Sequence, residues 1–258
     1  EIIKKYGDGV MCVFPADHYI RDETVFSEIL NEAISIAENE DKLITIGITP
    51  TFPSTGYGYI KFNKNEKAIA KKVECFVEKP DLDKAKEYIA DGNYVWNSGM
   101  FIWRASVILN KFKELLPDVY EGIEKIGTAL GTEKEEDVID EVYPDIPKIS
   151  IDYGIMETAD NVVVIEGEFG WNDVGSWDTL GVMYSEDSQC NVSKGENILI
   201  DTKNSVIFSD KRLIATIGLD NIVIVETEDA ILVCDKNRAQ DVKKVVDILN
   251  EKKLNRYL

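Results

Sequence analysis

The chain has 258 residues, with 29 Lys and Arg against 48 Asp and Glu, which gives a formal net charge of −19. A surface this acidic repels nucleic acid and anionic lipid, so neither is expected as a partner, and it also repels phosphorylated small molecules. A phosphate site therefore needs local positive charge from a metal ion, a specific Lys or Arg, or a helix N-terminus.

The length accommodates one large α/β domain with a smaller companion. Four cysteines lie far apart and form no CxxC pair, which favours reduced thiols in a cytoplasmic protein over disulfides or a zinc site. No apolar run approaches the ~20 residues that span a bilayer, so no membrane partner is expected. The chain opens at Glu1 and not at Met, as a fragment does.

The first two thirds of the sequence alternate strands and helices. Apolar runs at Gly9–Phe14 and Leu43–Ile48 predict strands covered on both faces. Asp22 is a suitable cap for an amphipathic helix that follows it, and residues 81–91 predict a second helix closed by Gly92. A strand through Met100–Trp103 and helical stretches over 105–139 come next. This alternation predicts a Rossmann-like domain with a mainly parallel sheet, in which ligands lie at the carboxyl ends of the strands.

The pattern changes near Gln189. Five short apolar runs, each stopped by Asp, Asn, Gly or Thr, predict a compact all-β module, a short β-helix or a barrel-like stack. An amphipathic helix with Val242, Val245, Val246 and Leu249 on one face ends the chain. We therefore predict two domains, residues 1–187 and 188–258.

Polar residues and glycines interrupt or follow several predicted strands. Glycine allows a ligand to approach the backbone closely, and carboxylates, an amide and one lysine suit a polyol phosphate with a divalent metal. The residues concerned are Asp17, Tyr57, Gly58, Glu78, Lys79, Asn97 and Asp173.

Taken singly, each of these residues has an ordinary structural explanation. Asp17 could cap a turn, Glu78 and Lys79 could be a solvated pair before a helix, and glycines are common in turns. His18, the sole histidine, makes no triad and no zinc site, so local packing is its simplest role.

Taken together, six motifs closely resemble one family, the mannose-1-phosphate guanylyltransferases among the sugar nucleotidyltransferases. The motifs, in chain order, are FPADHYI, ITPTFPSTGYGYI, FVEKPD, WNSGMFIW, SIDYGIMET and FGWNDVGSWDTL. The tail RLIATIGLDNIVIVETEDAILVC also resembles the C-terminal module of that family. The resemblance implies a nucleotidyltransferase domain that carries a short left-handed β-helix.

The resemblance also implies residue roles. It assigns Asp17 and Asp173 to the catalytic Mg²⁺, and Lys79 to the sugar phosphate. By the same resemblance, Tyr57, Gly58, Glu78 and Asn97 would bind the sugar. Asp152 and Tyr153 would line the same pocket.

The implied reaction transfers GMP from GTP to mannose 1-phosphate and yields GDP-mannose and pyrophosphate. The attacking phosphate is already an anion near neutral pH, so no general base is needed, and the chain offers no Ser-His or Cys-His pair. Catalysis then consists of positioning and charge neutralisation. A homodimer is expected because β-helix modules often self-associate.

Two departures qualify the resemblance. The family's Gly-rich loop, with its Arg and Lys for the triphosphate, has no counterpart in these residues, so we expect the chain alone to turn over little. Thr158 stands where many relatives carry Lys. The alternatives are a related enzyme for glucose or another sugar with UTP or dTTP, and a non-catalytic sugar-phosphate-binding regulatory subunit.

Overall fold

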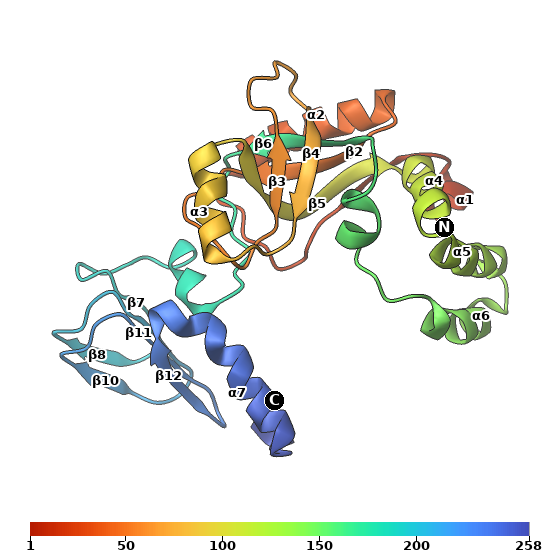
Figure 1. Ribbon diagram of the computed structural model, residues 1–258. Coiled ribbons are helices and arrows are strands. Elements are labelled where there is room, and N and C mark those ends of the chain that lie inside the picture. Colours follow the sequence, from red (N-terminus) through yellow and green to blue (C-terminus); the bar gives the residue numbers. More distant parts are fainter. Residues whose placement is uncertain (258) are drawn as a thin grey trace. The chain divides into compact units, whose positions relative to one another are not determined.

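The computed structural model describes residues 1–257 and divides into two compact units (Figure 1). The sheet unit comprises Glu1–Ala16 and Ile20–Trp171. The β-helix unit comprises Asp17–Tyr19 and the chain from Asn172 onward. The short segment Asp17–Tyr19 joins the second unit because Tyr19 forms an antiparallel bridge with Asn172, with N–O distances of 2.8 and 3.0 Å.

The sheet unit is built on six strands in the order β1-β5-β2-β6-β4-β3, and β3 also pairs with β5. Their bounds are β1 Val10–Val13, β2 Leu43–Ile48, β3 Tyr59–Phe62, β4 Lys71–Val77, β5 Tyr94–Arg104 and β6 Val162–Gly167. The α/β class is confirmed. Strand directions are more mixed than the sequence indicated: among the described strands of this sheet, β2 and β6 pair in parallel and the other pairs are antiparallel.

Helices cover both faces of this sheet (Figure 1). The helices of the sheet unit are α1 Ile2–Tyr6, α2 Glu23–Asn39, α3 Leu82–Asp91, α4 Ala105–Leu115, α5 Pro117–Ala129 and α6 Glu135–Val142. On one face, Ala33 and Ala37 of α2 pack against Ile44 and Ile46 of β2. On the other face, Val107 and other α4 residues pack with a π-helical turn, Asp152–Met156. Strand β2 is consequently buried along its whole length, as its unbroken apolar run predicts.

Local signals fix the ends of the helices. The Asp22 carboxylate accepts a 3.0 Å hydrogen bond from the Val25 backbone N–H, which confirms the expected cap of α2. Gly92 closes α3 in the left-handed conformation, with φ of 76°. Among the described helices, none is both long and apolar enough to cross a membrane.

The β-helix unit stacks short parallel strands into coils (Figure 1). The strands are β7 Val192–Lys194, β8 Asn197–Ile200, β9 Val206–Ser209, β10 Ile214–Ile217, β11 Ile222–Glu226 and β12 Ile231–Asp235. Strands β7, β9 and β11 place Val192, Val206 and Val223 in one register inside the stack. Strand β12 then turns back antiparallel to β11, and α7, Val242–Glu251, follows. The predicted β-helix module is confirmed.

A buried carboxylate ties two coils of this unit together. The side chain of Glu226 is 1% exposed and meets Arg212 Nη1 at 2.6 Å. It also accepts hydrogen bonds from the backbone N–H groups of Lys211, Asp210 and Arg212, and these bonds lower the pKa of Glu226 from its ordinary 4.5. A lowered pKa means that the charged form stabilises the fold above pH 4.5 and that this contribution is lost as the pH falls below it.

We therefore expect Glu226→Gln to lower the melting temperature at pH 7 by roughly 5 °C, because the backbone donors lose their anionic acceptor. The difference in melting temperature between this variant and wild type should become smaller below pH 4.5. Scanning calorimetry across this range tests the expectation, with Glu228→Gln as control, since Glu228 pairs with Lys211 at the surface. An equal, pH-independent effect of both substitutions would contradict it.

Candidate active site

The interruption of the apolar run around Asn97 is a β-bulge. On β5 the strand begins at Tyr94, six residues before the predicted start at Met100, because the polar residues are accommodated within it. Opposite β2, Thr45 pairs with Phe101 and Gly47 with Asn97, so β5 carries extra residues between these pairs. A bulge bends a strand and re-aims its side chains, and it leaves backbone groups that need other partners.

Ser98 and Gly99 make the bulge possible. The buried Ser98 hydroxyl donates to the Ile46 carbonyl at 2.6 Å and accepts from the Met100 N–H at 3.2 Å, so it satisfies backbone groups at the bulge. Gly99 adopts φ of 69°, a conformation that favours glycine. The hydroxyl of Ser98 and the absence of a side chain at Gly99 therefore both serve the backbone of the bulge.

Asn97 is held in a fixed orientation at this bulge. Its Oδ1 accepts from the Gly99 N–H at 3.1 Å and from the Thr45 hydroxyl at 3.4 Å. Its Nδ2 donates to Asp152 Oδ1 at 2.8 Å. Asp152 opens the π-helical turn, so an element 55 residues away in sequence meets the bulge. The structure thus brings together two of the residues that the sequence predicted.

Gly58 and Glu78 lie at the same place. The Gly58 carbonyl accepts from the Asn97 N–H at 2.8 Å. A Cβ on Gly58 would approach Glu78 Oε2 to 2.7 Å and Asn97 Cβ to 3.6 Å, so a side chain here would displace the Glu78 carboxylate. Lys79 Nζ lies 3.3 Å from Glu78 Oε1 with 60% of its side chain exposed, and its φ is 42°. A non-glycine residue in this conformation is unusual and often marks a functional position.

Glu157 is a further acidic residue of this cluster, which the sequence analysis did not single out. Burial raises its pKa from the ordinary value, and the charges of Glu78 and Asp152 raise it further. The sequence signal was its place in SIDYGIMET, directly after the π-helical turn. Glu78, Asp152 and Glu157 thus form a group of oxygen acceptors beside one lysine and one oriented amide.

Tyr57 and Tyr153, which were also predicted to line the sugar pocket, make other contacts. Tyr57 packs in an aromatic cluster, with ring centroids 4.9 Å from Trp96 and 5.3 Å from Trp171. Tyr153 is 55% exposed, and its backbone N–H donates to Ser150 Oγ at 3.3 Å.

The predicted metal-binding carboxylates both belong to the β-helix unit. Asp17 and Asp173 come from segments about 156 positions apart, which the Tyr19–Asn172 bridge joins. Burial lowers the pKa of His18, and the negative charges of Asp17 and Asp173 act against this shift. Both carboxylates therefore lie near the one imidazole of the chain.

A strained turn holds Asp173. The Asn172 side chain accepts from the Val174 N–H at 2.7 Å, and Asp173 Oδ1 accepts from the Gly175 N–H at 3.2 Å. Val174 has φ of 50°, which is rare for a β-branched residue. A Cβ on Gly175 would lie 2.7 Å from Asp173 Oδ2, so glycine leaves room for the carboxylate.

The donor set fits a hard divalent cation. Mg²⁺ prefers oxygen ligands and is commonly held by one or two carboxylates together with substrate phosphates. Within residues 1–257, no group of three or more His, Cys, Asp or Glu side chains is arranged to hold a metal ion.

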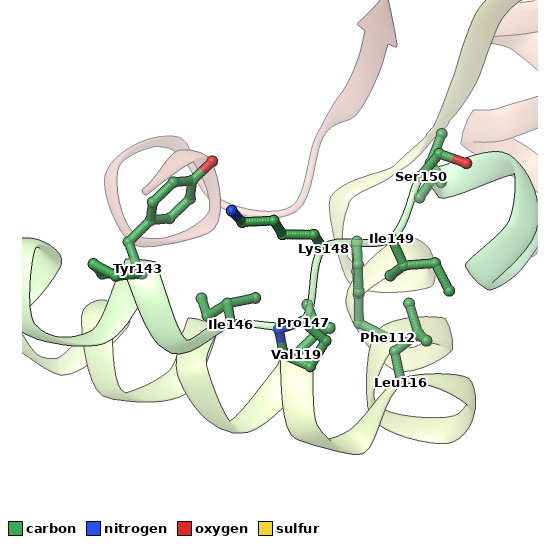
Figure 2. Close-up of a pocket in the computed structure, with 11 residues that line it drawn as sticks. Phe112, Leu116, Val119, Tyr143, Ile146, Pro147, Lys148, Ile149 and Ser150 are labelled. Carbon is green, nitrogen blue, oxygen red and sulfur yellow. The ribbon is translucent and has the colours of Figure 1, made fainter.

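A cavity of about 840 Å³ lies in the sheet unit (Figure 2). Side chains from α4, α5 and residues 143–151 line it, and most of them are apolar, with Lys148 reaching across the opening toward Tyr143. None of the eleven lining residues is a predicted site residue.

Comparison with protein-family models matches residues 1–189 to the family described as nucleotidyl transferase. The chain belongs to the nucleotidyl transferase family. Residues 195–249 match a second model, described as MannoseP isomerase/GMP-like beta-helix domain. The predicted combination of a nucleotidyltransferase domain with a C-terminal β-helix is thereby confirmed. The domain boundary between 187 and 188 stays a prediction.

Curated relatives carry more specific names. The chain is 43% identical over 251 residues, 97% of its length, to the mannose-1-phosphate guanylyltransferase of Salmonella muenchen. It is 40% identical over 245 residues, 93% of its length, to the mannose-1-phosphate guanylyltransferase of Escherichia coli. These matches cover 53% and 51% of the two relatives, so the chain spans about half the length of the curated relatives it matches.

A solved structure covers the chain almost completely. It is described as mannose-1-phosphate geranyltransferase from Thermus thermophilus, and it superposes with a TM-score of 0.85 at 37% identity. The match covers 96% of this chain and 72% of that chain. Nucleotidyl transferases generally use a divalent metal.

Proposed function

We propose that this nucleotidyl transferase transfers GMP from GTP to mannose 1-phosphate, forming GDP-mannose and pyrophosphate. The observation that carries the proposal is the cluster of Gly58, Glu78, Asn97 and Asp152 around the bulge, with Lys79 beside it. The names of the curated relatives support the choice of mannose and guanylyl transfer. The geranyl name of the solved structure fits neither the family model nor those relatives, so nucleotidyl transfer is favoured.

The bulge cluster is suited to a polyol phosphate. Carboxylates such as Glu78 and Asp152 accept hydrogen bonds from sugar hydroxyl groups, and the Asn97 amide donates to a ligand oxygen. Gly58 leaves room beside its backbone for the Glu78 carboxylate. Lys79, exposed and adjacent to Glu78, supplies the local positive charge that a phosphate needs on a chain of net charge −19. Tyr57 and Tyr153 are proposed as outer contacts of the same site.

Asp17 and Asp173 are proposed to hold Mg²⁺. The bound ion would neutralise phosphate charge as pyrophosphate leaves. The phosphate of mannose 1-phosphate is already anionic at neutral pH, so its attack on the α-phosphorus requires no general base. The protein's own part is then to orient the sugar phosphate and to place positive charge beside it.

The remaining assignments are proposals of the same kind. A cytoplasmic location is consistent with four cysteines that are free thiols, three of them exposed. A homodimer stays a prediction. The products, GDP-mannose and pyrophosphate, follow from the proposed reaction.

Isothermal calorimetry with mannose 1-phosphate, mannose and inorganic phosphate tests the sugar-phosphate site. We expect mannose 1-phosphate to bind at least about tenfold more tightly than either part, because it uses Lys79 and the hydroxyl acceptors together. In the Lys79→Ala variant, mannose 1-phosphate should bind no more tightly than mannose. The matched control is Lys64→Ala, an exposed lysine outside the cluster. Equal affinities for all three ligands would contradict the proposal.

A further inference from the structure

Thr45 is a buried hydroxyl in a strand that is otherwise apolar except for Gly47. It lies at the middle of β2 with none of its surface exposed. A buried hydroxyl costs free energy unless it forms a hydrogen bond, so its presence here calls for a partner. The partner is Asn97 Oδ1, at 3.4 Å across the sheet.

The orientation of the Asn97 amide decides what a ligand meets. An asparagine side chain can present either its oxygen or its NH₂ group in a given direction. Here the oxygen is occupied by two donors, the Gly99 N–H and the Thr45 hydroxyl, and the NH₂ group turns toward Asp152. If the amide turned over, its oxygen would face the Asp152 carboxylate with no proton between them.

We propose that Thr45 is a positioning residue, which acts through Asn97 to keep an N–H donor directed at Asp152 and at the bound ligand. This inference rests on the proposed function, because the ligand is taken to be the sugar phosphate. The Gly99 N–H can only donate, so it fixes which end of the Asn97 amide faces it, and it supplies the shorter bond. The Thr45 hydroxyl adds a second bond to the same oxygen and holds the amide in place.

The consequence concerns which ligand groups this site accepts. Glu78, Asp152 and Glu157 are acceptors near one another, as the raised pKa of Glu157 reports. An oriented Asn97 adds a neutral donor to this acceptor-rich group. The site therefore favours a ligand with several hydroxyl donors and one oxygen acceptor matched to Asn97, which is the chemistry of a sugar ring.

The test compares Thr45→Val, which removes the hydroxyl at similar volume, with Thr45→Ser, which retains it. We expect Thr45→Val to weaken mannose 1-phosphate binding about fivefold in calorimetry, with a nearly unchanged melting temperature, and Thr45→Ser to restore wild-type affinity. If Thr45→Val does not fold, Thr45→Ala, which also lacks the hydroxyl, replaces it in the binding experiment. As a contrast, Ser98→Ala should lower the melting temperature, because Ser98 bonds the backbone itself.

Two further measurements make the outcome decisive. In an Asn97→Ala background, Thr45→Val should have no additional effect on affinity, and a persisting fivefold loss would overturn the inference. Without ligand, the ¹H–¹⁵N signals of the Asn97 side-chain amide should shift in Thr45→Val and return in Thr45→Ser. Wild type that binds no mannose 1-phosphate would contradict the proposed function, whereas unchanged amide signals and affinity in Thr45→Val would contradict the role of Thr45.

Discussion

Asp173→Asn is expected to weaken Mn²⁺ binding at least about tenfold, because the substitution removes one of the two carboxylates proposed to hold the cation. Mn²⁺ stands in for Mg²⁺, since both prefer carboxylate oxygen, and it is detected directly by electron paramagnetic resonance. Asparagine keeps an oxygen that can accept the Gly175 N–H, so the turn at Val174 should persist. The loss should therefore reflect charge and not unfolding.

The matched control for this experiment is Asp247→Asn. Asp247 is exposed on α7, so this variant makes the same change of charge within the β-helix unit. Its affinity for Mn²⁺ should equal that of wild type. The variant thus controls for weak binding of Mn²⁺ to the many surface carboxylates of this acidic chain. Equal affinities for wild type and both variants would contradict the assignment of Asp173.

Asn97→Asp is expected to weaken mannose 1-phosphate binding on the order of 100-fold, about 2.7 kcal/mol. The substitution replaces the N–H donor that lies 2.8 Å from Asp152 Oδ1 by a carboxylate oxygen. Two carboxylates at this distance repel each other, so the pKa of the pair rises. Calorimetry should then find partial recovery as the pH is lowered toward about 5, where a shared proton replaces the lost donor.

Asn63→Asp provides the comparison for this second prediction. The Asn63 side-chain oxygen accepts from the Asn65 N–H in an exposed turn, a role that aspartate fills equally well. This variant should bind mannose 1-phosphate as wild type does at every pH. A loss in Asn97→Asp that shows no pH dependence would indicate a disrupted strand and not a charged pair.

The elements of the fold could be predicted because their signals are local. The cap at Asp22, the left-handed Gly92 and the apolar run of β2 each depend on residues within one turn or one strand. The short runs after Gln189 likewise end where turn residues stop them, and they form strands β8 to β12. Strand directions could not be predicted in this way, because pairing depends on how distant segments meet.

The candidate site was predictable as a set of residues and not as a geometry. Asn97 and Asp152 carry no sequence signal that they meet, and their contact requires a bulge in β5 and a π-helical turn. Thr45 is one β-branched residue in an apolar strand, a pattern that does not indicate a partner for its hydroxyl. Glu157 acquires its raised pKa from Glu78 and Asp152, neighbours that the folded chain supplies.

The strongly negative charge of the chain agrees with this arrangement. A uniform charge of −19 opposes any phosphorylated ligand, so attraction must be local and short in range. By our proposal, Lys79 would provide it in the sheet unit, and a cation at Asp17 and Asp173 would provide it in the β-helix unit. The remaining acidic surface can then repel other anions without affecting the reaction.

His18 offers the most direct test of the cation site. It is the one histidine of the chain, and both Asp17 and Asp173 influence its ring, so its imidazole proton signals report on an ion held there. Mn²⁺ at substoichiometric concentration should broaden these signals in wild type, excess Mg²⁺ should restore them, and Asp173→Asn should abolish the broadening. Sharp His18 signals in wild type at Mn²⁺ concentrations that broaden other parts of the protein would contradict a cation held by Asp17 and Asp173.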